Sequence, residues 1–322
     1  GVGGVVALLV IGWLSLQRGD IPWATLESRY ANSASRYMDL PGGLHVHYRD
    51  QGNPAGPTLV MIHGFGASLH AWEPWVARLG DRYRISTLDL PAHGLTRAPS
   101  TYAMSLDNSA EVVDALTRRL NVGPFVAVGN SMGGGVAWTL ALRHPDRVRA
   151  LVLVDAVGGP MQRGGNRNTP PIFRVLGNPI GRALIRNIDT RGLVQPSLRA
   201  AYVDPALVTP ALVNRYVDLS RAPGHRDIIL GGRGGGGPQA PDTSRFARIH
   251  VPTLVLHGDA DVVIPLASGR ALAGLIPGAR LIVYPGAGHV PMEQIPDRSA
   301  ADVRAFLAPL DPPAPAAPPA AN

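Results

Sequence analysis

Short, mostly apolar runs alternate with amphipathic segments along most of this chain. The runs cover residues 58–62, 83–88, 125–128, 148–154, 251–256 and 280–284. Several segments between them place apolar residues at helical spacing, as in 106–120. Strands that are apolar on both faces and alternate with helices predict an α/β protein. We therefore expect a mostly parallel central sheet flanked by helices.

One stretch interrupts this alternation. Residues 158–248 are rich in proline, glycine and arginine and contain helical fragments, such as 180–187 and 210–218. This predicts an inserted helical cap over the carboxyl ends of the strands. The predicted organisation is an anchor at 1–17, a linker at 18–36, the first part of the core at 37–157, the cap at 158–248, the second part of the core at 249–311 and a disordered Pro/Ala-rich tail at 312–322.

The beginning of the chain is a candidate membrane anchor. Residues 1–16 carry no charge, and the first charged side chain is Arg18. A helix over this run spans roughly 25 Å, a little less than the roughly 30 Å hydrocarbon core of a bilayer. The sequence begins with glycine rather than methionine, so residues upstream are expected to lengthen the span. We predict an uncleaved anchor, with a cleaved signal peptide or a buried core helix as alternatives.

The amino-acid composition excludes several kinds of chemistry and binding. A chain of 322 residues that is 45% hydrophobic can form one large domain with an insertion. The absence of cysteine excludes disulfides, thiolate catalysis and cysteine-based zinc sites. The net charge of +7 comes from scattered arginines without an aromatic-interleaved cluster. This distribution argues against nucleic-acid binding and fits a weak attraction to anionic membrane surfaces.

The segment 125–142 carries the strongest functional signal. An apolar strand runs into Gly-Asn-Ser-Met-Gly at 129–133, and a helix-compatible segment follows. Strand, Gly-x-Ser-x-Gly and helix form the context of a nucleophile elbow, a tight turn that exposes a serine at the end of a strand. Its neighbours must be small, because a Cβ would collide with the strand or the helix. We therefore predict that Ser131 is a nucleophile.

A glycine-rich loop follows the apolar run at 58–62. Its residues are His63, Gly64, Phe65 and Gly66. Backbone N–H groups in such a loop can stabilise the oxyanion that develops when a serine attacks a carbonyl. The second donor of an oxyanion hole is the N–H of the residue after the nucleophile. The predicted donors are thus the backbone groups of Phe65 and Met132.

Two further polar residues follow predicted strands and complete a serine-hydrolase constellation. His289 would accept the serine proton, because a serine hydroxyl is a poor nucleophile at neutral pH. Asp261, in a Gly-x-x-Asp turn, would orient the imidazole through its other nitrogen. Along the chain the order is serine, aspartate, histidine, which is one of the known orders of such triads.

The identity of the acid has an alternative. Asp155 ends the strand at 148–154, and Asp259 and Asp261 both follow the strand at 251–256. We predict Asp261 as the acid, with Asp155 as the alternative. Asp259 is expected to be a turn or capping residue.

A metal site has little support in the sequence. His45 and His47 share one face of the alternating segment 44–49. No third ligand accompanies them, so a solvated strand face is the preferred interpretation. No metal and no cofactor is predicted.

With these motifs in place, the chain resembles the α/β-hydrolase superfamily over residues 37–307. The matching residues include His63, Gly64, Phe65 and Gly66, the run 89–94, the run Gly129, Asn130, Ser131, Met132, Gly133 and Gly134, then Gly258, Asp261, Gly288 and His289. The Gly-Asn-Ser-Met-Gly-Gly run is similar to bacterial family V esterases and lipases. It is also similar to hydrolases that cleave carbon–carbon bonds in meta-ring-fission products. The His-Gly-Phe-Gly loop and the apolar N-terminus look more like the esterase branch.

This resemblance implies a serine carboxylesterase or lipase that acts through an acyl-enzyme on a small-molecule ester, lipid esters included. A carbon–carbon bond hydrolase is the enzymatic alternative and would be expected to have a pocket arginine. A catalytically inactive binding module is the non-enzymatic alternative. The apolar N-terminus predicts anchoring to a bacterial inner membrane, with a secreted or periplasmic protein as the alternative.

Overall fold

The computed structural model describes residues 2–160, 178–231 and 242–311; the predicted tail at 312–322 lies outside these ranges. The described residues form one eight-stranded sheet in the order β1-β2-β4-β3-β5-β6-β7-β8. The strands are β1 (Ser35–Leu40), β2 (Leu44–Gly52), β3 (Thr58–Ile62), β4 (Arg84–Leu88), β5 (Phe125–Asn130), β6 (Val148–Val154), β7 (Thr253–Gly258) and β8 (Arg280–Tyr284).

The sheet is mostly parallel, which confirms the predicted fold class. The strands from β4 to β8 in the sheet order pair in parallel, whereas β2 pairs antiparallel with both β1 and β4. All six predicted apolar runs lie within or overlap these parallel strands, because a strand covered on both faces must be apolar on both.

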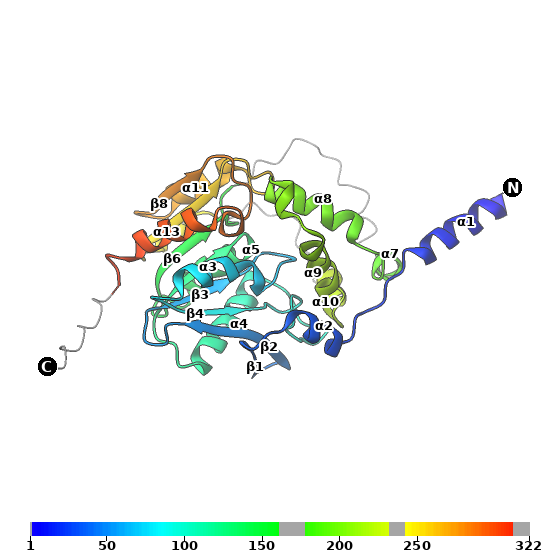
Figure 1. Ribbon diagram of the computed structural model, residues 1–322, viewed down its shortest axis with the longest axis horizontal. Coiled ribbons are helices and arrows are strands. Elements are labelled where there is room, and N and C mark those ends of the chain that lie inside the picture. The colour runs from blue at the N-terminus through cyan, green and yellow to red at the C-terminus, as the bar shows by residue number, and fades with distance from the viewer. Residues whose placement is uncertain (1, 161–177, 232–241, 312–322) are drawn as a thin grey trace.

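Helices cover both faces of the sheet (Figure 1). On one face, Val60 and Ile62 pack in a core with α4 (Leu106–Arg119), α5 (Met132–Arg143) and α11 (Leu266–Leu275). On the other face, Leu59 and Met61 pack in a core with α3 (Glu73–Leu79), α12 (Pro291–Gln294) and α13 (Pro296–Leu307). A 3₁₀ turn, η1 (Leu69–Trp72), leads into α3. This three-layer arrangement brings the carboxyl ends of the parallel strands to one edge.

Between β6 and β7 the chain forms a group of helices that we call the cap. Its described helices are α7 (Pro179–Ile185), α8 (Arg191–Tyr202), α9 (Pro210–Ser220) and α10 (His225–Gly231). The expected fragments correspond to α7 and α9. Helix α8 was not expected, since it contains Pro196, which normally interrupts a helical pattern.

The linker at 18–36 contains a short helix where the sequence predicts one, at about 24–30, and its last residues belong to a strand. The helix is α2 (Trp23–Tyr30), and β1 begins at Ser35. The expectation of a solvated face for the β2 histidines is wrong for His47, which is fully buried. Strand β2 lies between β1 and β4, and its His47 Nδ1 donates to Asp89 Oδ2 at 2.7 Å.

The apolar start of the chain forms α1 (Val2–Ser15), which projects away from the body (Figure 1). Its side chains include exposed apolar residues, such as Leu8 at 70% and Leu9 at 68% exposure, so the described helix is not part of the core. Across the described ranges, no helix is both long enough and apolar enough to cross a membrane. The predicted membrane span is therefore not supported by α1 as described.

Candidate active site

Ser131 lies between β5 and α5 in a strained backbone conformation. Its φ is 54° and its ψ is −118°, in a region that residues with a side chain rarely adopt. Such strain costs on the order of 1–3 kcal/mol and persists only where the surroundings enforce it. Ser131 immediately precedes the first turn of α5, whose N–H groups and dipole favour negative charge. The turn has the geometry of a nucleophile elbow.

The glycines around Ser131 leave no room for a side chain. A Cβ on Gly129 would lie 2.1 Å from the Gly133 carbonyl oxygen, and a Cβ on Gly133 would lie 2.0 Å from the Ile62 carbonyl oxygen. A Cβ on Gly134 would lie 2.3 Å from the Ala156 Cβ. The glycine pattern in the sequence therefore follows from close backbone contacts in the elbow.

Asp261 and His289 form a direct pair. The imidazole Nδ1 of His289 donates to Asp261 Oδ2 at 2.7 Å, and Asp261 Oδ1 accepts the N–H groups of Val263 and Ile264 at 2.7 and 3.0 Å. Burial alone would raise the pKa of Asp261. The hydrogen bond and charge of His289 and the Ile264 N–H outweigh burial and lower this pKa. Asp261 is thus held as a carboxylate that fixes the imidazole.

Asn130 connects the His289 loop to the elbow. Its Nδ2 donates to the His289 carbonyl at 3.0 Å and to the Val154 carbonyl at 3.1 Å. From the cap side, the Ala201 carbonyl accepts the His289 N–H at 2.8 Å. Among the described residues, Ser131 Oγ makes no direct hydrogen bond to His289. Such contacts are commonly long without a substrate and tighten when one binds.

The loop after β3 reaches over the elbow. A Cβ on Gly64 would lie 3.1 Å from the Ser131 Cβ, which places the next residue, Phe65, beside the serine. Neither the Phe65 N–H nor the Met132 N–H donates to any residue that the structure describes. Two backbone donors are thus available next to Ser131, as expected for an oxyanion hole. The Phe65 side chain itself is 55% exposed.

His63 and Gly66 shape this loop. The buried His63 donates from Nδ1 to the Gly64 carbonyl at 2.7 Å and accepts the Leu90 N–H at Nε2 at 3.0 Å. Burial lowers the pKa of His63, so the ring is neutral and can serve as both donor and acceptor. Gly66 has a φ of 74°, which glycine adopts without strain. These residues support the loop rather than react.

Asp155, the alternative acid, makes no hydrogen bond to His289. It is fully buried, its φ is 44°, and its Oδ1 accepts the Gly258 N–H at 3.0 Å. Burial, together with the neighbouring charge of Asp261, raises the pKa of Asp155 well above its usual value. The geometry therefore favours Asp261 as the partner of His289. Asp259 accepts the Gly286 N–H at 2.7 Å, as a turn residue does.

Two groups of side chains bring potential metal ligands within 4.8 Å of one another. They are Asp155, His257 and Asp261, and Glu111, Asp114 and His144. In the first group, His257 Nε2 donates to the Ile264 carbonyl, and Asp261 is bonded to His289. In the second group, both carboxylates pair with arginines. The carboxylates of the second group are thus paired, whereas Asp155 Oδ2 and His257 Nδ1 of the first group are buried without a hydrogen-bond partner among the described residues.

Sequence reasoning missed the contribution of the cap to this site. The Ala201 carbonyl holds the His289 backbone, and a Cβ on Gly288 would lie 2.2 Å from that carbonyl oxygen. Backbone contacts of this kind have no residue-type signature. The only hint in the sequence is the glycine before His289.

Comparisons with known proteins show the family of the chain. A family model described as alpha/beta hydrolase fold matches residues 57–295. The chain is 31% identical to a 2-hydroxymuconate semialdehyde hydrolase of Pseudomonas sp. (strain CF600), over 84% of this chain and 93% of that protein. It is 27% identical to a pimeloyl-[acyl-carrier protein] methyl ester esterase of Nitrosomonas europaea, over 79% and 96% respectively. A solved structure of a bacterial membrane phospholipase A is similar with a TM-score of 0.68 and 26% identity, over 96% of this chain and 98% of that one.

Proposed function

The chain belongs to the alpha/beta hydrolase fold family, and within it we propose a serine hydrolase that cleaves carboxylic esters. One observation carries this proposal. A strained serine at a helix N-terminus lies beside two unpartnered backbone N–H groups, and an Asp–His pair is tied to the residue before that serine. Nucleophile, base and oxyanion donors are the parts that acyl transfer requires.

In the proposed mechanism, His289 removes the proton from Ser131 Oγ as that oxygen attacks the ester carbonyl. The Phe65 and Met132 N–H groups stabilise the tetrahedral oxyanion, a contribution of roughly 3 kcal/mol per donor. His289 then gives its proton to the leaving alcohol, and an acyl-enzyme remains. Water attacks the acyl carbon while His289 takes its proton, and return of that proton to Ser131 Oγ releases the carboxylic acid.

The second candidate is a carbon–carbon bond hydrolase. The 31% identity to a 2-hydroxymuconate semialdehyde hydrolase favours it. An arginine near the serine would be expected for a substrate of that class. Arg29, Arg49 and Arg215 line a cavity between the cap and the core, but neither Ser131 nor His289 lines that cavity. We therefore place the ester hydrolase first.

The test is hydrolysis of p-nitrophenyl esters from acetate to palmitate, alongside a coloured dienoate ring-fission product. The proposal predicts ester turnover well above dienoate turnover, and the chain-length optimum separates an esterase from a lipase. Dienoate cleavage with no ester turnover by the folded protein would instead establish the carbon–carbon hydrolase.

We also propose that α1 binds a bacterial membrane surface. Its apolar side chains are exposed, and its end is held to the cap through Trp13 Nε1 to the Leu184 carbonyl at 2.9 Å and Asp189 N–H to the Leu16 carbonyl at 2.8 Å. The membrane phospholipase A is similar over 96% of this chain. With α1 at the surface, the cap would face lipid-like esters.

Flotation with vesicles of phosphatidylethanolamine and phosphatidylglycerol tests the membrane proposal. The double variant Leu8→Arg, Leu9→Arg is expected to lose flotation. The control Leu193→Arg changes an equally exposed leucine on α8 and is expected to keep it. A secreted or periplasmic enzyme without membrane affinity would show no flotation in any of these proteins.

A further inference from the structure

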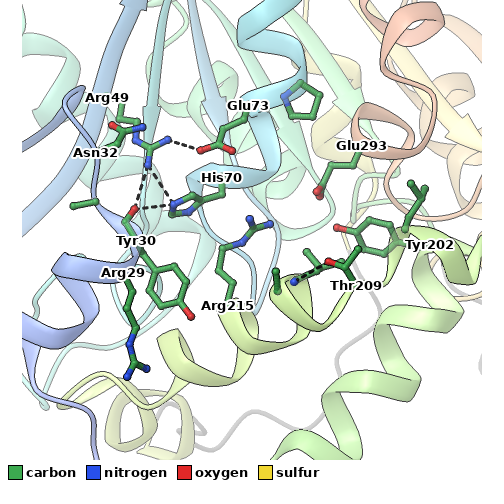
Figure 2. Close-up of a pocket in the computed structure, with 15 residues that line it drawn as sticks. Arg29, Tyr30, Asn32, Arg49, His70, Glu73, Tyr202, Thr209, Arg215 and Glu293 are labelled. Atoms are coloured by element: carbon green, nitrogen blue, oxygen red, sulfur yellow. Dashed lines mark hydrogen bonds and ion pairs between the residues drawn. The ribbon is translucent and has the colours of Figure 1, made fainter.

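A second concave site lies between the cap and the core. The cavity measures about 510 Å³ and is bordered by α2, η1, the start of α3, α12 and the cap helices α8 and α9 (Figure 2). Ser131, His289, Phe65 and Met132 do not line it. The cavity is therefore separate from the residues assigned to the reaction.

Some charges in this cavity are already paired. Arg49 Nη1 donates to Glu73 Oε1 at 2.7 Å, and Arg29 Nη1 donates to Asp218 Oδ2 at 2.9 Å. His70 Nε2 donates to the Tyr30 carbonyl at 2.9 Å. Burial, the largest influence on His70, lowers its pKa to about 4, so the ring is neutral near pH 7. These side chains therefore already have hydrogen-bond partners within the protein.

Three other polar groups in the cavity lack regular hydrogen bonds. Arg215 Nε, the Tyr202 hydroxyl and Glu293 Oε1 are buried atoms, and none of them makes a hydrogen bond of regular geometry to a described residue, although Tyr202 and Glu293 are near enough to influence each other's pKa. Arg215 also makes no ion pair with a described carboxylate. Tyr202 is only 2% exposed. Figure 2 shows the three side chains converging from α9, α8 and α12 on the same region of the cavity.

Unsatisfied buried polar groups destabilise a fold, and a ligand that bonds to all three would remove this cost. A guanidinium fork matches the two oxygens of a carboxylate. A tyrosine hydroxyl adds one donor. Burial raises the pKa of Glu293 to about 7, with the charge of Arg215 and the neighbouring Tyr202 hydroxyl opposing the rise, so near neutral pH this carboxyl can also donate.

We propose that this cavity is a second ligand site, which binds a small monocarboxylate through Arg215, Tyr202 and Glu293. One unpaired cation matches a single negative charge, and the nearby Glu73 and Glu293 disfavour a phosphate dianion. Pro74, Leu207 and Leu212 also line the cavity and suit a short aliphatic body. The proposal does not depend on whether Ser131 cleaves esters or carbon–carbon bonds.

The site lies directly behind the His289 loop. Tyr202 follows Ala201, whose carbonyl accepts the His289 N–H, and Glu293 lies in the short helix α12 that follows His289. A carboxylate bound here would bridge α8 and α9 of the cap to α12 of the core. Occupancy would thereby hold the cap against the loop that carries the imidazole.

The test is calorimetric titration of the full chain carrying Ser131→Ala, so that turnover contributes no heat. Sodium hexanoate is the probe, with hexanamide and inorganic phosphate as comparisons. Hexanoate is expected to bind one to one, and at least about tenfold more tightly than either comparison, because a charge-assisted bond is worth that much. Adding Arg215→Gln is expected to weaken hexanoate at least about tenfold.

The matched control is Arg29→Gln, which changes an arginine of the same cavity that already pairs with Asp218; less than about a twofold effect is expected. Tyr202→Phe removes a single oxygen and is expected to weaken hexanoate about threefold even if Arg215→Gln fails to fold. The proposal would be overturned if Arg29→Gln and Arg215→Gln lost the same affinity for hexanoate, or if Tyr202→Phe lost none.

Two further experiments determine where the ligand binds. Glu293 faces Tyr202, Arg215 and Glu73. Because Glu293 becomes charged as the pH rises from 6 to 8, the binding of hexanoate should weaken over this range. Glu293→Gln is expected to make the affinity for hexanoate nearly independent of pH. In a crystal soaked with 6-bromohexanoate, the bromine is expected between Leu207 and Leu212. A bromine position beside Ser131, or a pH dependence unchanged in Glu293→Gln, would contradict a separate site.

Discussion

The part of the chain that the structure describes contains two Ser–His–Asp groupings, and one of them has the surroundings of an active site. In the first, His289 Nδ1 donates to Asp261 Oδ2 at 2.7 Å, next to the elbow that carries Ser131. In the second, His47 Nδ1 donates to Asp89 Oδ2 at the same 2.7 Å, and Ser35 Oγ lies 2.8 Å from His47 Nε2. By hydrogen bonds alone, the second grouping is the more complete.

The difference lies around the serines. Ser35 lies in regular strand β1, and its Oγ accepts the Asn32 N–H at 3.1 Å. Ser131 has a strained backbone, begins a helix and lies beside two unpartnered N–H groups. A hydrogen-bonded relay therefore stabilises a fold as readily as it serves a reaction. A strained backbone at the nucleophile and donors for the oxyanion mark the reactive grouping.

The largest contrast is expected for the two histidines. His289→Ala should lower kcat for a p-nitrophenyl ester by at least about 10⁴-fold with little change in Tm, because the base is lost. His47→Ala should instead lower the free energy of unfolding by about 3 kcal/mol, because it leaves the buried Asp89 without its partner. Steady-state kinetics and urea melts of both variants check this. Equal losses of activity per folded molecule would remove the distinction.

The two aspartates sharpen the same contrast. Asp261→Asn should lower kcat on the order of 10⁴-fold, because the amide no longer holds the required tautomer of His289. Asp89→Asn preserves shape and should keep kcat within about threefold while lowering stability. The measurement is kcat at saturating ester together with Tm for each variant. A large kcat loss in Asp89→Asn would assign this buried grouping a role in the reaction.

Acid titration tests the structural grouping by itself. Burial disfavours ionisation of Asp89, but the hydrogen bond and charge of His47 outweigh it and hold the pKa of Asp89 below its usual value. A lowered pKa stabilises the fold above the unfolded pKa of about 3.9, and this stability is lost as the pH falls through the folded pKa. The Tm deficit of Asp89→Asn should therefore shrink between pH 5 and acidic pH. A deficit independent of pH would contradict this linkage.

The smallest effect is expected at Asp155. Burial and the neighbouring charge of Asp261 raise the pKa of Asp155 and disfavour its ionised form, so replacement by a neutral side chain of the same shape removes little. Asp155→Asn should change kcat less than about threefold. A loss as large as that of Asp261→Asn would make Asp155 the catalytic acid.

The elbow was predictable because its steric demands require particular residues. Gly129 and Gly133 approach other backbone atoms too closely for any Cβ, so the pattern around Ser131 is visible in the sequence. The parallel strands were predictable for a similar reason, since burial on both faces demands continuous apolar runs. His289 could be inferred from its place just after such a strand.

The remaining features depend on contacts between distant segments. His47 meets Asp89 and Ser35 only because β1, β2 and the loop after β4 come together, and no periodicity predicts that contact. Arg215 on α9 and Glu293 on α12 line one cavity because the cap packs against the core. The sequence does not predict this packing, since the cap helix α8 contains Pro196, a residue that normally ends a helix. Backbone acceptors such as the Ala201 carbonyl have no sequence signature.

The most direct test of the central claim is covalent labelling with a fluorophosphonate, which forms an ester only with an activated serine hydroxyl. Wild type, Ser131→Ala, Ser35→Ala and His289→Ala would be treated, and the modified peptide identified by mass spectrometry. We predict label on Ser131 in wild type and Ser35→Ala, none in Ser131→Ala, and strongly slowed labelling in His289→Ala. Label on another residue, or undiminished labelling without His289, would contradict the assignment of Ser131 as the activated nucleophile.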